Sequence, residues 1–84
     1  MDPKLVIKHF EFIFKWLNKN HMLTKDGIEI YKSGIDPEIS LVSTYLTDRG
    51  NAFIKKYYDK YISDIKYGNE NEKLLNTFLK EFDK

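Results

Sequence analysis

The sequence of 84 residues contains no cysteine, which excludes disulfide scaffolds, cysteine-ligated zinc sites, thiol nucleophiles and redox motifs. Arginine is almost absent as well, because Arg49 is the single arginine among 14 basic residues. Bidentate guanidinium contacts are the usual means of recognising guanine and phosphate, so this inventory argues against a strong reader of base sequence. The formal net charge is only +1, and any attraction to nucleic acid therefore depends on a local group of lysines.

Groups that carry catalysis or bind metals are also scarce. His9 lies among apolar residues of the first segment, which favours a core histidine over a general base, and His21 is expected in an exposed turn. The two histidines are twelve residues apart without acidic ligands beside them. The sequence has no glycine-rich phosphate loop, nucleophile elbow or EF-hand pattern. We therefore predict a protein that is not an enzyme and needs no metal, cofactor or small-molecule substrate.

Long uninterrupted apolar runs are missing too. The segment from Leu5 to Leu17 is largely apolar, but Lys8, Glu11 and Lys15 interrupt it, and no small-residue cleavage site follows. Such a segment is too polar for a signal peptide or a membrane span. We expect no membrane association and a cytoplasmic protein.

The composition that is present favours folding, since 42% of the residues are hydrophobic and 15% are aromatic. A chain this short must use nearly every apolar side chain to offset the entropy lost on folding. We expect one domain over residues 1–84, with a core spanning 2–67. A C-terminal helix at about 70–82 carries an apolar stripe and is a candidate dimerisation element.

Helix start and stop signals divide the chain into about five helices. These signals are the pairs Asp2-Pro3 and Asp36-Pro37, the N-caps Thr24 and Thr47, and the C-cap Gly34. The expected helices cover residues 4–18, 25–33, 36–46, 48–66 and 70–82. About two-thirds of the first helix is apolar, so it either runs through the middle of the fold or forms part of a partner surface. Its remaining side chains form one polar stripe: Lys4, Lys8, Glu11, Lys15 and Asn18.

The fold class expected from this pattern is mainly α, a compact bundle with a helix-turn-helix-like centre. An α+β alternative stays open, because residues 28–32 alternate in polarity and residues 39–46 are rich in β-branched side chains. Those two runs would form a β-hairpin at about 27–46. The capping residues at both ends of each run favour helices.

A Leu-Thr-x-x-Gly segment occurs twice, at residues 23–27 and 46–50. Each copy stands at the start of an expected helix. We interpret the repetition as a coincidence of common capping residues, because two helix pairs are too few for a solenoid.

Two stretches resemble DNA-binding families. Residues 23–46, LTKDGIEIYKSGIDPEISLVSTYL, resemble a helix-turn-helix with its turn at Gly34-Ile35 and a recognition helix from Pro37. Residues 45–58, YLTDRGNAFIKKYY, are similar to the junction between the wing and the last helix of MarR- and PadR-type winged-helix regulators. Only about 27 residues separate Asn20 from Asp48, whereas a complete winged helix needs roughly 35–40 there. Either the wing or one helix is therefore missing, which gives a reduced winged helix.

The resemblance implies DNA contacts by a set of polar residues from the centre of the chain. The residues expected at DNA are Lys25, Lys32, Ser40, Ser43, Thr44 and Arg49. The two lysines would meet phosphates, the hydroxyls would meet groove edges, and Arg49 would meet either. A further set of lysines, interleaved with tyrosines, is a candidate for phosphate contact: Lys55, Lys56 and Lys60. Packing of the tyrosines in the core, with the lysines as a solvated face, explains the second set more simply.

Two functions follow as hypotheses. The first is a small non-enzymatic DNA-binding protein that regulates transcription as a homodimer. The second is a small phage- or plasmid-type protein that binds a larger host protein and inhibits or recruits it. Small size, near-neutral charge and a high aromatic content suit the second hypothesis. The apolar stripes of the first and last helices favour a homodimer in either case.

Overall fold

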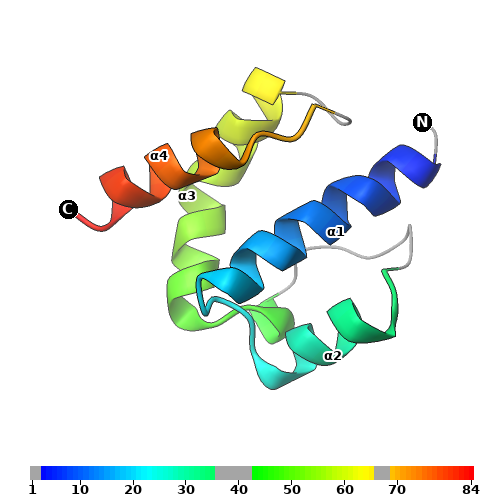
Figure 1. Cartoon of the computed structure of the whole chain (residues 1–84). Helices are drawn as coiled ribbons and strands as arrows, with labels where there is room; N and C mark the ends of the chain where they lie inside the picture. Colours follow the sequence, from blue (N-terminus) through cyan, green and yellow to red (C-terminus); the bar gives the residue numbers. More distant parts are fainter. Residues whose placement is uncertain (1–2, 36–42, 66–68) are drawn as a thin grey trace.

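The computed structural model describes residues 3–35, 43–65 and 69–84. In chain order its elements are α1 (Pro3–Lys19), α2 (Lys25–Ser33), the 3-10 helix η1 (Ser43–Tyr45), α3 (Asp48–Ile65) and α4 (Glu72–Phe82). In Figure 1, α1 crosses the molecule with α2 below it and α4 above it, and α3 runs steeply behind. The described residues hold four α-helices and no β-strand. The prediction of a mainly α fold is thus confirmed, while a fifth helix and a two-stranded wing are not found among these residues.

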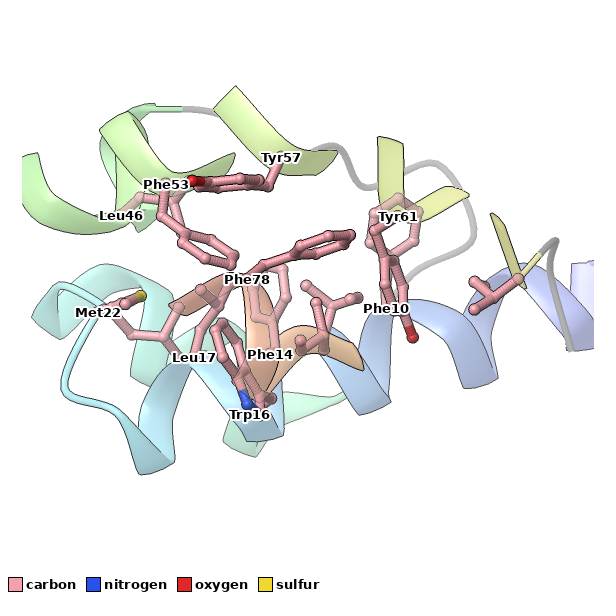
Figure 2. Packing of buried hydrophobic residues seen from close by; sticks show 14 of the residues in the cluster. Phe10, Phe14, Trp16, Leu17, Met22, Leu46, Phe53, Tyr57, Tyr61 and Phe78 are labelled. Atoms are coloured by element: carbon pink, nitrogen blue, oxygen red, sulfur yellow. The ribbon is translucent and has the colours of Figure 1, made fainter. Parts of the chain in front are cut away.

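Helix α1 is the central helix of the fold, which explains its unusually apolar sequence. Its side chains that face the other helices are at most 8% exposed: Phe10, Ile13, Phe14, Trp16 and Leu17. Figure 2 shows them meeting side chains from α3 and α4 in one cluster. Of the two roles open to α1 from its sequence, the central position is the one observed.

Helix α2 begins where its sequence predicts, at the N-cap Thr24. The side-chain oxygen of Thr24 accepts a hydrogen bond from the backbone N–H of Gly27 at 3.2 Å. The helix ends at Gly34, whose φ of 113° suits a residue without a Cβ. The alternative of a β-hairpin is therefore wrong, because its first strand, residues 28–32, lies inside a helix that is capped at both ends.

The helix predicted over residues 36–46 falls mostly on residues 36–42, which lie outside the described part. Its described end is not α-helical. Residues Ser43–Tyr45 form η1, and Leu46 pairs with Leu23 in an isolated antiparallel bridge. The prediction of an α-helix is wrong over residues 43–46, where the carbonyls of Thr44 and Tyr45 accept hydrogen bonds from Thr24 in the segment before α2.

Helices α3 and α4 agree with the predicted ranges to within two residues. The buried stripe of α3 is Gly50, Phe53, Tyr57, Tyr61 and Ile65. Helix α4 packs on it with Leu75 and Phe78, and the rings of Tyr57 and Phe78 stack at 5.2 Å between centroids. The apolar stripe of α4, predicted as a candidate dimerisation element, thus contributes to the core of its own chain.

Candidate functional site

Two of the predicted DNA contacts lie on α2. Lys25 and Lys32 are exposed, and their seven-residue spacing places them on one face of the helix. The same exposed side of α2 also carries Asp26 and Glu29. The charge of this surface is therefore balanced, and it attracts phosphate weakly.

Of the other predicted contacts in the chain centre, Thr44 and Arg49 each interact with another described segment. Thr44 is exposed, and its backbone carbonyl accepts a hydrogen bond from the hydroxyl of Thr24 at 2.6 Å. Arg49 is directed to the end of α4, where its guanidinium lies 2.6 Å from the carboxylate of Asp83. Ser40 and the side chain of Ser43 lie outside the described residues.

The three lysines predicted as phosphate contacts on α3 are all exposed, while of the tyrosines near them Tyr58 is half-buried and two are buried. Tyr57 and Tyr61 are 4% and 0% exposed, so they pack the core as the simpler interpretation predicts. The ammonium of Lys56 lies 5.4 Å from the ring centre of Tyr57, and that of Lys60 lies 5.3 Å from the ring centre of Phe78. Lys55 is exposed as well. These residues form a solvated helix face with cation–π contacts at its edge.

Among the described helices, α1 has the largest excess of basic over acidic residues. We call the row of its lysines the lysine stripe, and its members are Lys4, Lys8, Lys15 and Lys19, all exposed. Their spacings of four, seven and four residues hold them within a narrow band along the solvent side of the helix. Glu11 is the one acidic residue of α1, and it is exposed within this band, three residues after Lys8 and four before Lys15. The polar stripe predicted from the sequence contains Lys4, Lys8 and Lys15, together with Glu11 and Asn18, but not Lys19.

The stripe is about 22 Å long, because fifteen residues separate its ends at roughly 1.5 Å each. An anionic chain that lies along α1 therefore meets positive charge over several successive phosphates, whose charges recur about every 3.4 Å along one strand of duplex DNA. The total charge of the protein conceals this local excess.

A shallow pocket of about 180 Å³ opens at the C-terminal end of the stripe, between α1 and the start of α4. We call it the α1–α4 pocket, and it is lined by Phe12, Lys15, Trp16, Lys19 and Glu72. The ammonium of Lys19 lies 3.0 Å from the carboxylate of Glu72, and both side chains are solvent-exposed. The pocket thus combines the half-buried ring of Phe12 with two members of the lysine stripe.

The wall formed by Trp16 is held in place by a side chain of α4. The indole N–H of Trp16 donates a hydrogen bond to the side-chain oxygen of Asn76 at 2.9 Å. Because Trp16 is only 3% exposed, this bond satisfies a donor that has little access to water.

His9 is fully buried, as predicted for a core histidine. Its Nε2 lies 2.8 Å from the hydroxyl of Tyr58 on α3, and its Nδ1 lies 3.1 Å from a carboxylate oxygen of Glu70. Burial lowers the pKa of His9, and the hydrogen bond and charge of Glu70 partly oppose that effect. The three side chains connect α1 with α3 and with the segment before α4, which is a structural role.

The described residues contain no group of three or more histidine, aspartate or glutamate side chains placed to hold a metal ion. None of the helices in the described ranges is long and apolar enough to cross a membrane. Comparison with protein families, curated proteins and solved structures gives no significant match.

Proposed function

We propose that the protein is a small non-enzymatic DNA-binding protein that holds the phosphate backbone with the lysine stripe of α1. The single observation that carries this proposal is the alignment of four exposed lysines on one side of one helix, with Glu11 as the only acidic residue of that helix. Lysine binds phosphate as a point charge without reading bases, which fits a chain with one arginine. The resemblance of residues 23–58 to winged-helix regulators supports a regulatory role.

The surface of the described residues supports this function over docking to a host protein. Leu5, at 38%, is the only large hydrophobic side chain exposed among them. Stable protein interfaces have an apolar centre, whereas the partly exposed hydrophobic side chains among the described residues pack against the core of the chain. The apolar stripes from which a homodimer was predicted are also largely packed inside one chain, where Leu75 and Phe78 of α4 are buried.

The test is the salt dependence of binding to a generic duplex, measured by fluorescence anisotropy. If all four lysines of the stripe contact phosphates, we expect log K to fall with log salt concentration with a slope of about −3.6. The double substitution Lys8→Gln and Lys15→Gln removes the two central charges, so it should weaken binding and reduce the slope by about 1.8.

The matched control is Lys25→Gln together with Lys32→Gln, which changes the net charge equally on the exposed face of α2. This control should bind almost as the unmodified protein does. A larger loss in the α2 variant than in the α1 variant would instead place DNA on the residues predicted from the sequence. Absence of duplex binding at low salt would refute DNA binding and favour the protein partner.

A further inference from the structure

The α1–α4 pocket places an aromatic side chain beside the lysine stripe, and binding of the DNA phosphate backbone alone does not require one. Its lining includes the half-buried ring of Phe12 together with Lys15 and Lys19, whereas Trp16 is only 3% exposed and offers no open ring face. An aromatic surface beside a row of cations is the arrangement by which proteins bind unpaired nucleotides, with the base on the ring and the phosphates on the lysines. We propose that this pocket receives one unpaired base of a nucleic-acid strand that lies along the stripe.

The size of the pocket agrees with a single flat ring system. Its volume of about 180 Å³ is below the range of roughly 300–1,000 Å³ that drug-sized ligands occupy. It nevertheless equals the volume of about six liquid water molecules, so it holds more than one or two trapped waters. A base that is still paired and stacked in a duplex presents only its edge in a groove, so the ligand has to be unpaired.

The ion pair between Lys19 and Glu72 affects how tightly a nucleic-acid strand binds at the pocket. Lys19 is already paired with Glu72 at 3.0 Å, and an incoming phosphate has to compete with that carboxylate. Because both partners are exposed, the pair is weak and the exchange costs little. Glu72 therefore acts as a negative charge at the pocket mouth, and its removal should strengthen the binding of any strand.

The inference rests on the proposed function, because it assigns a ligand class to the stripe described there. Trp16 is the only tryptophan in the chain and lines the pocket, and its ring also packs against Phe53 in the core, so a change in its fluorescence is interpreted together with the affinities of the probes. Three probes of equal length are titrated at low salt: oligothymidine, an abasic oligonucleotide with the same phosphates, and a duplex. We expect oligothymidine to quench Trp16 and to bind at least about fivefold more tightly than the abasic strand.

Two variants examine the walls and the mouth of the pocket separately. Phe12→Leu keeps an apolar side chain but removes the aromatic face, so it should abolish the preference for oligothymidine and leave abasic affinity unchanged. Glu72→Gln should tighten binding of both single strands by about twofold to fivefold. Glu81→Gln, an equal charge change at another exposed position of α4, is its control and should have less effect. Circular dichroism establishes that each variant is folded.

The outcomes separate the two proposals. Equal affinity for oligothymidine and the abasic strand, without quenching of Trp16, would overturn the pocket while leaving backbone binding by the stripe intact. Binding of none of the three probes would refute the proposed function, and the pocket with it. If Phe12→Leu still showed quenching of Trp16 fluorescence and still preferred oligothymidine to the abasic strand, the base would bind elsewhere.

Discussion

Leu23 and Leu46 form an isolated antiparallel bridge between the segment that leads into α2 and the segment that leads into α3. Each leucine is the first residue of a Leu-Thr-x-x-Gly segment, and the two segments bind each other reciprocally. The N–H of Thr24 donates to the carbonyl of Tyr45 at 3.0 Å, and the N–H of Thr47 donates to the carbonyl of Met22 at 2.9 Å. The repetition in the sequence therefore has a physical role, because each copy completes the backbone hydrogen bonding of the other.

The glycines of the two segments are required by this pairing. A Cβ on Gly27 would overlap the carbonyl oxygen of Tyr45, and a Cβ on Gly50 would lie 2.6 Å from the carbonyl oxygen of Met22. Alanine at an open helical position stabilises by about 1 kcal/mol relative to glycine. Here overpacking against backbone costs about 1–3 kcal/mol, so we expect Gly27→Ala and Gly50→Ala to lower the free energy of unfolding.

The measurement is urea denaturation followed by circular dichroism. Gly27→Ala should be the more damaging of the two, because its clash with backbone is closer. Glu29→Ala, at an exposed position of α2, is the control and should change stability by less than about 0.5 kcal/mol. A stabilising effect of Gly27→Ala would show that the two segments are not packed as described.

The two threonines were predicted as N-caps, and in the structure their hydroxyls also connect the two segments. The hydroxyl of Thr24 accepts from the N–H of Gly27 and donates to the carbonyl of Thr44 at 2.6 Å. That of Thr47 accepts from the N–H of Gly50 at 3.1 Å. Loss of an N-cap typically costs about 0.5–2 kcal/mol, so Thr24→Ala and Thr47→Ala should each destabilise the protein by that order.

Substitution by serine keeps the hydroxyl of each threonine and removes only its methyl group, so it tests the hydroxyl by itself. Thr24→Ser and Thr47→Ser keep the oxygen that caps each helix, so we expect each to retain most of the stability in thermal melts. A difference of 1 kcal/mol shifts the midpoint by roughly 4–8 °C in a domain of this size, which makes the comparison measurable. If serine were as destabilising as alanine, the caps would not be responsible.

The helices that could be predicted from the sequence are those whose local signals agree with their tertiary contacts. Thr24 and Gly34 bound α2, and the N-cap of α4 is Asn71, one residue after the predicted helix start. Residues 43–46 were not predictable in this way. Their Ser, Thr and Tyr side chains suit a helix as well as an extended chain, and the choice is made by Met22 and Thr24, about twenty residues earlier.

In the candidate site too, features set by neighbouring residues could be predicted from the sequence, and contacts between residues far apart in the chain could not. The spacing of the lysine stripe is visible in the sequence, because it depends only on the helical period. The α1–α4 pocket is not visible, because Glu72 is brought to Lys19 across 53 residues by the packing of α4 on α1. The ion pair between Arg49 and Asp83 was hidden for the same reason.

The hydrogen bond between Trp16 and Asn76 predicts a specific loss of stability. Asn76→Ala removes the acceptor of an indole N–H that is almost fully buried, and an unsatisfied buried donor costs about 1–3 kcal/mol. Asn76→Asp retains an oxygen at the same position, so we expect it to cost clearly less. The check is chemical denaturation followed by circular dichroism, and equal losses in both variants would mean that the bond contributes nothing.

The buried histidine makes stability depend on pH in a direction that the structure fixes. Burial lowers the pKa of His9 in the folded state below its ordinary value of about 6.5, although Glu70 opposes this shift. The unfolded chain therefore binds a proton at a pH where the folded protein does not. The contribution of His9 is fully present above pH about 6.5, and it decreases as the pH falls from there towards the folded-state pKa.

We expect the free energy of unfolding, measured with urea at pH values from about 5 to 8, to decrease towards the acid end of that range. His9→Gln removes the titrating imidazole and should flatten this part of the profile, even though it also lowers stability throughout by disturbing the contacts with Tyr58 and Glu70. Glu70→Gln removes the carboxylate that favours the charged imidazole, so the decrease should extend to lower pH. A profile in His9→Gln parallel to that of the unmodified protein would show that other groups cause the dependence, because only a shifted His9 pKa gives a slope that disappears with the imidazole.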